Sequence, residues 1–206
     1  MIAVKVLCVG RNYAKHVREL GGSLPSEPIW FWKPESAIVR DGESVVVPAG
    51  VGAVHHEVEL AVRIGSVARR VAADSALAHL DACTVAVDVT ARDLQNKAKQ
   101  AGEPWTRAKG FDTFLPLGEW QPLPSDLQAI RLRLSVNGTV RQDGSTSDML
   151  WAVADLVSRA SAWTTLHPGD VLLTGTPEGV GPIVSGDDMV AEVVGMARVR
   201  NPVVAG

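Results

Sequence analysis

Acidic residues interrupt two short apolar segments of the chain at strand-like spacing. Residues 54–62 place Glu57 and Glu59 on one face of a strand and apolar side chains on the other. In residues 84–90, valines share one face and Asp88 lies on the opposite one. Carboxylates among buried strand residues cost free energy unless they are paired with cations or bind a metal. The pattern therefore predicts two strands that bring three carboxylates together.

Similar runs of apolar and β-branched residues predict further strands. Asn137-Gly138 favours a type I′ turn, so the strands that flank it are expected to form a hairpin. Residues 105–112 and the glycine- and proline-rich residues 175–182 are predicted to be loops, and the residues after 193 a short tail. The other predicted strands are a first strand that ends at Gly10 and residues 29–33, 45–47, 130–136, 139–140, 171–174 and 189–193.

Four segments have the spacing or boundary signals of helices. In the third, Thr90 is expected to be the N-cap, with Asp93 completing a near capping box. Arg92 and Gln95 then share a face at the start of that helix, on the turn that follows Asp88. The predicted helices are residues 12–20, 74–82, 91–99 and 149–160.

Composition restricts the class of protein. The 206 residues are enough for one domain, and a hydrophobic content of 46% suits an ordinary globular core. A net charge of −3 without a basic cluster argues against nucleic-acid and membrane partners. Cys8 and Cys83 lie in apolar segments and predict buried thiols in a reducing compartment. Because the N-terminus lacks a signal-peptide pattern, a cytoplasmic protein is expected.

The three carboxylates are the strongest candidate for a metal site. Without a well-placed soft ligand, they favour Mg²⁺ or Mn²⁺, and Ca²⁺ is a further possibility. The alternative is a solvated acidic face of a purely structural β domain. His55 and His56 match no zinc spacing, and strand alternation places them on opposite faces. His55 shares the acidic face, where it either hydrogen-bonds to a metal ligand or has a structural role.

Other candidate residues have weaker signals. His16 and Glu19 are three residues apart on a predicted helix, which is the geometry of a general base with an orienting carboxylate and also of a surface pair. Lys109, in a predicted loop, either projects its charge into a site or is solvated. The loop after Thr174 lacks the Gly-Lys-Ser/Thr ending of a nucleotide-binding P-loop.

Five motifs, taken together and in this order, resemble the fumarylacetoacetate hydrolase family. The likeness runs from about residue 7 to residue 195. It is greatest to the short members of the acylpyruvate hydrolase and oxaloacetate decarboxylase type, including bacterial 2-hydroxyhepta-2,4-diene-1,7-dioate isomerase homologues. The motifs are GRNYAKH at 10–16, VHHEVEL at 54–60, DVTARDLQ at 88–95, KGFD at 109–112 and LTGTP at 173–177.

The resemblance implies an α+β fold that is mostly β, with a rolled mixed β-sheet or β-sandwich core and a few short helices. It implies a single catalytic domain over residues 1–206, a lid helix and loop at about residues 10–35, and a homodimer. It also implies residue roles. By this likeness the metal ligands are Glu57, Glu59 and Asp88, the catalytic residues are His16, Glu19 and Lys109, and the substrate-binding residues are Arg92, Gln95 and Thr176.

The resemblance further implies an Mg²⁺- or Mn²⁺-dependent enzyme acting on small 2-oxo or 2,4-dioxo acids through an enolate. The favoured reactions are hydrolysis of an acylpyruvate, such as fumarylpyruvate or acetylpyruvate, and decarboxylation of oxaloacetate. Isomerisation of 2-hydroxyhepta-2,4-diene-1,7-dioate, decarboxylation of 5-carboxymethyl-2-hydroxymuconate and oxaloacetate tautomerisation are alternatives. A non-catalytic metal- or ligand-binding protein is the alternative of another class. Candidates for an acyl pocket are Trp30, Trp32, Trp105 and Phe111.

Overall fold

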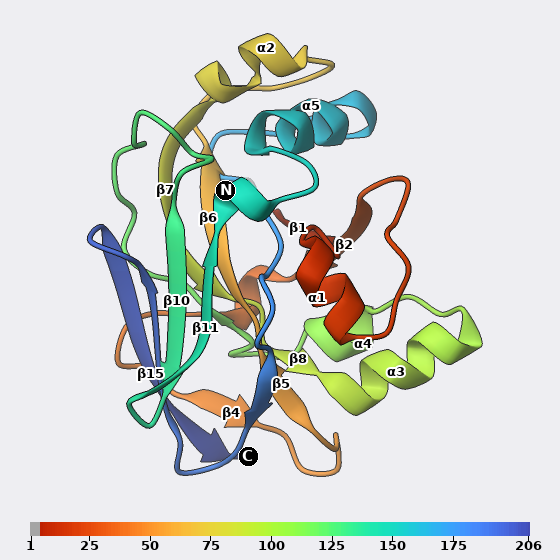
Figure 1. Ribbon diagram of the computed structural model, residues 1–206, viewed down its shortest axis with the longest axis vertical. Coiled ribbons are helices and arrows are strands. Elements are labelled where there is room, and N and C mark those ends of the chain that lie inside the picture. The colour runs from red at the N-terminus through yellow and green to blue at the C-terminus, as the bar shows by residue number, and fades with distance from the viewer. Residues whose placement is uncertain (1–4) are drawn as a thin grey trace.

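The computed structural model describes residues 5–206, and two five-stranded β-sheets form most of it (Figure 1). The first sheet has the strand order β2-β1-β12-β6-β7. Strands β1 and β12 are parallel and the other neighbours are antiparallel, so the sheet is mixed. Its strands are β1 Val6–Gly10, β2 Ile29–Lys33, β6 Val58–Ile64, β7 Leu80–Val87 and β12 Val171–Leu173.

The second sheet has the order β11-β10-β14-β15-β4 and packs on β6 and β7 of the first. The side chains between the two sheets form the main core, which includes Leu60, Val85, Leu132 and Leu134. Together the sheets make the mostly β architecture with mixed sheets that the resemblance implies. The strands of this sheet are β4 Val45–Val47, β10 Arg131–Val136, β11 Thr139–Ser145, β14 Asp188–Val193 and β15 Ala197–Ala205.

Two small sheets and a few short helices complete the fold. Helices α2 and α5 pack on each other at one end of the molecule, and α1, α3 and α4 lie together on one side (Figure 1). The remaining strands are β3 Ile38–Val39, β5 Val54–His56, β8 Thr90–Ala91, β9 Leu115–Pro116 and β13 Gly181–Ile183. The helices are α1 Ala14–Glu19, α2 Ala73–Ala76, α3 Arg92–Ala101, α4 Thr106–Lys109 and α5 Val153–Trp163, with 3₁₀ turns at Glu35–Ala37, Leu77–His79 and Thr146–Asp148.

The strand predicted over residues 54–62 is divided at Glu57 into β5 and β6, which belong to different sheets. Glu57 is left out of both ladders because its carbonyl accepts the Asp88 N–H at 2.8 Å. On the other side of the break, the Val58 N–H donates to the Gln142 side chain at 2.9 Å. The break turns the chain where its acidic residues begin.

Other predictions are corrected at element boundaries. Thr90 is not an N-cap, because α3 begins at Arg92 with Ala91 as its cap and no side-chain cap hydrogen bond. The helix predicted over 74–82 ends early, since β7 begins at Leu80, and the one predicted over 149–160 begins only at Val153. Three predicted irregular segments contain regular elements: α4 lies in the loop 105–112, β13 overlaps the end of the loop 175–182, and β15 replaces the tail.

The predicted hairpin between β10 and β11 is confirmed. Asn137 and Gly138 have φ values of 52° and 75°, as a type I′ turn requires. Cys8 and Cys83 are free and buried, also as predicted. The first predicted strand is described only from Val6, and residues 1–4 lie outside the described residues.

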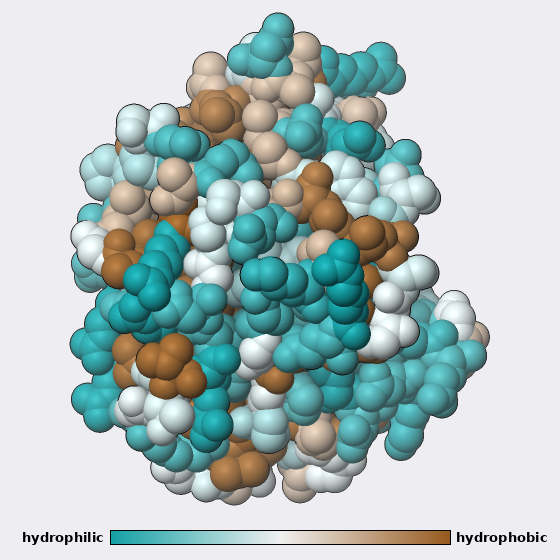
Figure 2. All heavy atoms as spheres, in the orientation of Figure 1, coloured by the Kyte–Doolittle hydropathy of each residue, from teal (hydrophilic) through white to brown (hydrophobic). Residues whose placement is uncertain are grey.

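The surface of the molecule is mixed in character. Figure 2 shows one face as mostly hydrophilic, with hydrophobic residues in small separate groups. Within residues 5–206, no helix is long and apolar enough to cross a membrane.

Candidate functional site

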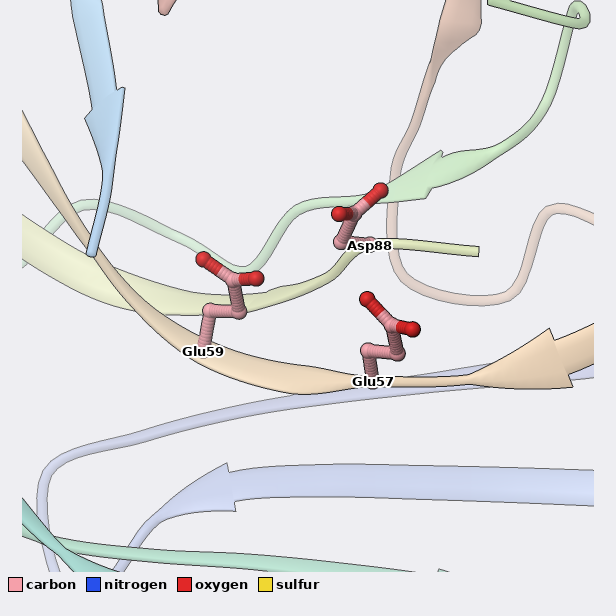
Figure 3. A group of neighbouring side chains, drawn as sticks. All are labelled: Glu57, Glu59 and Asp88. Atoms are coloured by element: carbon pink, nitrogen blue, oxygen red, sulfur yellow. The ribbon is translucent and has the colours of Figure 1, made fainter. Parts of the chain in front are cut away.

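Glu57, Glu59 and Asp88 form a buried acid cluster beneath the short helices. The three side chains rise from neighbouring strands toward one space (Figure 3). One ligand oxygen from each lies within 4.8 Å of the others, and each residue is at most 5% exposed. The pairing of β6 with β7, which sets Val58 opposite Val87, brings Asp88 next to Glu57 at the end of the ladder. The structure therefore brings together the three carboxylates that the sequence singled out.

Two buried lysines face Asp88. Lys109, at the end of α4, donates from Nζ to Asp88 Oδ2 at 2.5 Å, Glu57 Oε2 at 2.8 Å and Thr90 Oγ1 at 2.7 Å. Burial lowers the pKa of Lys109, but the charges of Asp88 and Glu57 outweigh burial and raise it overall. Lys33 Nζ, from β2, lies 2.9 Å from Asp88 Oδ1. Lys109 was predicted to be part of the site from the sequence, and Lys33 was not.

One oxygen of Asp88 is left without a hydrogen bond. Lys33 Nζ donates to the carbonyls of Val89 at 3.0 Å, Lys109 at 2.6 Å and Phe114 at 2.8 Å. An ammonium has three protons, so none is left for the nearby Asp88 Oδ1. That oxygen is buried and accepts no hydrogen bond. A buried lone pair inside a group of three carboxylates is a good fit to a hard divalent cation, which prefers oxygen ligands.

The two glutamates of the acid cluster differ in their electrostatic balance. Burial alone would raise the pKa of Glu57, but Lys109 and Arg92 outweigh burial and hold it well below the ordinary value. The pKa of Glu59 is raised well above the ordinary value by burial and then by the negative charge of Asp88. Its carboxylate accepts the Gly175 N–H at 2.6 Å. Glu59 thus lacks the positive charge that a metal would supply.

Arg92 connects the acid cluster to α3. Its Nη2 donates to Glu57 Oε1 and its Nη1 to Gln95 Oε1 at 2.6 Å. Its Nε donates to His55 Nδ1 at 3.4 Å. Burial, and then the charge of Arg92, lower the pKa of His55 to about 4. His55 is therefore neutral near pH 7. The sequence left two alternatives for His55, a hydrogen bond to a metal ligand or a structural role. In the structure its side chain accepts a hydrogen bond from Arg92, which in turn donates to Glu57.

His16 and Glu19 lie on α1 and form the predicted pair. His16 Nδ1 lies 3.2 Å from Glu19 Oε2, and His16 is buried. Glu19 Oε1 accepts the Gly179 N–H at 3.0 Å, which docks α1 on the glycine-rich loop. Within residues 5–206, no hydrogen-bond partner occupies His16 Nε2. The second ring nitrogen is therefore available to a bound molecule.

Thr176 is held in the same loop by Gln142. The side-chain amide of Gln142 donates to Thr176 Oγ1 at 2.8 Å and to the Pro177 carbonyl at 3.0 Å. Its carbonyl oxygen lies 3.0 Å from His56 Nδ1. Gln142 comes from β11, far along the chain, and was not predicted to be part of the site.

The acid cluster opens into one small cavity that eight of the nine predicted site residues line, and the ninth, Glu19, contacts His16. The free space in it is about 20 Å³, near the volume that one water requires. Trp105 is the one predicted acyl-pocket aromatic that lines it, whereas Trp30 and Trp32 pack on Trp163 and Phe111 packs on Phe114. The residues that line the cavity include Arg11, His16, Leu20, Phe31, Glu57, Glu59, Asp88, Arg92, Gln95, Lys99, Trp105, Lys109 and Thr176.

Comparisons with known proteins show what the whole chain is similar to. The family model described as "Fumarylacetoacetate (FAA) hydrolase C-terminal" matches residues 5–204. Oxaloacetate tautomerase YcgM of Escherichia coli (strain K12) is 46% identical over 90% of this chain and 86% of its own. The crystal structure of fumarylpyruvate hydrolase from Pseudomonas aeruginosa in complex with Mn²⁺ and pyruvate superposes with a TM-score of 0.94 at 34% identity, covering 99% of this chain and 91% of that one.

A third comparison concerns a different reaction. The structure of 5-carboxymethyl-2-hydroxymuconate delta-isomerase from Mycobacterium smegmatis has a TM-score of 0.89 at 45% identity, covering 100% of this chain and 80% of that one. Relatives of this chain therefore include a tautomerase, a hydrolase and an isomerase.

Proposed function

This chain belongs to the fumarylacetoacetate hydrolase family, and from that premise we propose that it is a divalent-metal-dependent enzyme acting on small 2-oxo acids through an enolate. Tautomerisation of oxaloacetate is the reaction we propose first, because a 46% identical relative over most of both chains is an oxaloacetate tautomerase. Hydrolysis of an acylpyruvate and decarboxylation of oxaloacetate, which the sequence favoured, are second candidates that use the same site.

The observation that carries the proposal is the acid cluster with its unpartnered Asp88 oxygen. Mg²⁺ or Mn²⁺ held by Glu57, Glu59 and Asp88 would act as a Lewis acid toward the oxo and carboxylate oxygens of a substrate. The three acids and the three cations around them, Lys33, Arg92 and Lys109, have a combined formal charge of zero when all are ionised. A divalent cation brings the sum to +2, which suits an anionic substrate.

The groups around the acid cluster have complementary roles in this proposal. Lys109 is fixed by three hydrogen bonds and places a positive charge where an enolate oxygen develops. Arg92 and Gln95, bonded to each other on α3, orient the carboxylate that lies next to the oxo group. Thr176 lines the same cavity and is available to a substrate oxygen.

His16 is the proposed proton carrier. In the enol-to-keto direction, His16 Nε2 gives a proton to the carbon next to the oxo carbon, and the enol hydroxyl proton passes to solvent. The reverse direction takes that carbon proton back onto Nε2. Glu19, against Nδ1, orients the ring and stabilises its protonated form. Because the cavity has room for about one water, substrate entry requires α1 to move away from the glycine-rich loop.

The His16–Glu19 pair also favours the hydrolytic candidate. There His16 takes a proton from water as the water attacks the 4-oxo carbon of an acylpyruvate, and carbon–carbon cleavage leaves the enolate of pyruvate. Decarboxylation of oxaloacetate produces the same enolate without an attacking water. The three reactions share the enolate and differ in the use of water.

An assay panel tests the proposal. Purified protein, first treated with chelator and then loaded with Mg²⁺ or Mn²⁺, is tested for oxaloacetate enol–keto exchange and decarboxylation and for turnover of acetylpyruvate, fumarylpyruvate and 2-hydroxyhepta-2,4-diene-1,7-dioate. We expect the highest kcat/KM for oxaloacetate exchange, and activity that disappears with chelator. Full activity without metal would overturn the metal mechanism, and a higher kcat/KM for an acylpyruvate would make hydrolysis the main reaction.

A further inference from the structure

We propose that Arg11 and Lys99 form a subsite for the second carboxylate of a dicarboxylic 2-oxo acid, and that this subsite makes the enzyme prefer dicarboxylic over monocarboxylic substrates. The inference rests on the proposed function, because it concerns the end of the substrate remote from the acid cluster. Arg11 and Lys99 are called the cation pair below.

The two residues come from different elements and meet the same cavity. Arg11 follows directly on β1, and Lys99 lies on α3. On that helix Arg92, Gln95 and Lys99 have the spacing i, i+3 and i+7, so they share the face that lines the cavity. Arg92 and Gln95 are buried against the acid cluster, whereas Lys99 is one turn farther out and half-buried. The cation pair thus lies toward the outer part of the cavity.

Trp105 connects the two members of the pair. Lys99 Nζ lies 5.2 Å from the centroid of the Trp105 ring. The ring of this tryptophan also approaches Gly10 so closely that a Cβ there would come within 2.9 Å of Trp105 Cζ3. Gly10 immediately precedes Arg11, so the same tryptophan contacts Lys99 and the residue next to Arg11. A glycine at position 10 is what allows this approach.

The cation pair differs from the inner cations in lacking an acidic partner. Within residues 5–206, neither Arg11 nor Lys99 forms an ion pair, whereas Arg92 and Lys109 both pair with Glu57. Burial, and then the positive charges of Arg92 and Arg11, lower the pKa of Lys99 to about 8. Two unpaired cations that line one cavity and repel each other are stabilised by an anion bound beside them.

The backbone of Arg11 is held in a conformation that side chains rarely adopt. Its φ is 61°, in the left-handed region, which costs about 1 kcal/mol for a non-glycine residue. The neighbouring Asn12 fixes it, because its side chain donates to the Thr174 carbonyl at 2.8 Å and accepts the Trp151 N–H at 2.8 Å. A glycine would adopt this φ without strain, so the arginine at this position is explained by its side chain in the cavity.

The expected consequence concerns substrate choice. The inner end of a 2-oxo acid takes the metal, Arg92 and Lys109, and these groups serve monocarboxylic and dicarboxylic substrates alike. The cation pair acts only on a substrate with a second carboxylate. Oxaloacetate and 2-oxobutyrate are a matched pair for this purpose, because they differ in having a carboxylate or a methyl group at the remote end.

The test is direct binding of these two acids to Mn²⁺-loaded protein by titration calorimetry. We expect wild-type protein to bind oxaloacetate at least tenfold more tightly than 2-oxobutyrate. Arg11→Met and Lys99→Met should each weaken oxaloacetate binding about tenfold or more, the range of hydrogen bonds to charged groups, while 2-oxobutyrate changes less than about twofold. Lys97→Met, which removes an exposed lysine from the same helix, is the control and should change neither.

Any one of four results would overturn the proposal. Equal weakening of both acids would show that the cation pair maintains the cavity and does not recognise a carboxylate. Equal binding of both acids to wild-type protein, or unchanged oxaloacetate binding in both variants, would remove the subsite and leave the proposed function standing. If neither acid binds the Mn²⁺-loaded wild type, the proposed function fails together with the subsite. Retained 2-oxobutyrate binding in each variant shows that the variant is folded.

Discussion

Lys33 Nζ lies 2.9 Å from Asp88 Oδ1 but donates its hydrogen bonds to three backbone carbonyls instead. The lysine therefore offsets the charge of the aspartate without occupying that oxygen. The carbonyls belong to Val89, Lys109 and Phe114, so one buried ammonium ties together three segments that surround the acid cluster. Lys33 holds the ligand region in shape and leaves Asp88 a free lone pair.

Replacing Lys33 by methionine should be strongly destabilising. The apolar side chain fills a similar volume, but three buried carbonyls lose their donor and Asp88 loses a neighbouring positive charge. Breaking a buried charge pair costs about 3–5 kcal/mol, and we expect the free energy of unfolding in urea to fall by that amount. Lys97→Met, at an exposed position, should change it by less than about 0.5 kcal/mol. A loss below about 1 kcal/mol in Lys33→Met would contradict this structural role.

Glu59→Gln and Asp88→Asn should differ in stability although both impair metal binding. The Gly175 N–H can still donate to a glutamine at 59, and the substitution removes a carboxylate whose pKa is raised by burial and by Asp88. Metal-free Glu59→Gln should therefore be at least as stable as wild type. Asp88→Asn leaves Lys33 without its buried acidic partner and leaves Lys109 with Glu57 alone, so it should lose about 3–5 kcal/mol.

The same two variants test the metal site by thermal unfolding. A divalent cation at about 100 times its Kd stabilises the folded state by about 2.7 kcal/mol, so Mn²⁺ should raise the Tm of wild type. Both variants should lose most of that rise and nearly all activity. Added EDTA should return wild type to its metal-free Tm. An equal Mn²⁺-dependent rise in all three proteins would place the bound metal elsewhere.

The sequence predicted most elements of the sheets because the alternation of their side chains reports burial directly. It missed the division of 54–62 because the Val58 N–H beside the break donates to Gln142, which is far away in the sequence. It missed β15 although residues 197–203 alternate between buried and exposed, since Pro202 argues against a strand. Local sequence patterns predict which face of a strand is buried, whereas the position at which a strand ends depends on contacts with residues far away in the sequence.

The candidate site was also predictable only in part from local sequence patterns. The acid cluster was visible because carboxylates stood at apolar strand positions. Lys33 had an equivalent signal, since it shares a strand face with Phe31 and both are buried. The Gln142 contacts and the cavity shared by Arg11 and Lys99 had no local signal, because tertiary packing alone creates them.

The proposed proton transfer predicts a graded response at α1. His16→Ala removes the proton carrier and should lower kcat for oxaloacetate exchange by about 10²–10⁴-fold, with a small change in KM. Glu19→Gln keeps an acceptor for the Gly179 N–H but removes the charge beside His16 Nδ1, so a smaller loss is expected. Stopped-flow absorbance of the enol measures both. Wild-type rates in His16→Ala would exclude it as the proton carrier.

The pH dependence of dicarboxylate binding should report Lys99. The ordinary pKa of a lysine is 10.5. Burial, followed by the charges of Arg92 and Arg11, lowers the pKa of Lys99 to about 8. Among the smaller contributions, the charge of Glu57 raises this pKa and the charge of Lys109 lowers it. Above about pH 8 Lys99 of the free protein loses its charge, so the Kd of oxaloacetate should rise with pH from there. A lysine with the ordinary pKa of 10.5 would still be charged at pH 8 and would give no such rise. Binding of 2-oxobutyrate should show no corresponding step.

Lys99→Met is the control for this assignment. With no titrating group at position 99, oxaloacetate binding should be weak at every pH and should lose the step near pH 8. Lys99→Arg keeps a charge at all these pH values, because a guanidinium does not deprotonate, and should retain tight binding through pH 9. Calorimetric titration of the Mn²⁺-loaded proteins at pH 7, 8 and 9 makes the comparison. A step that persists in Lys99→Met would assign the pH dependence to another group.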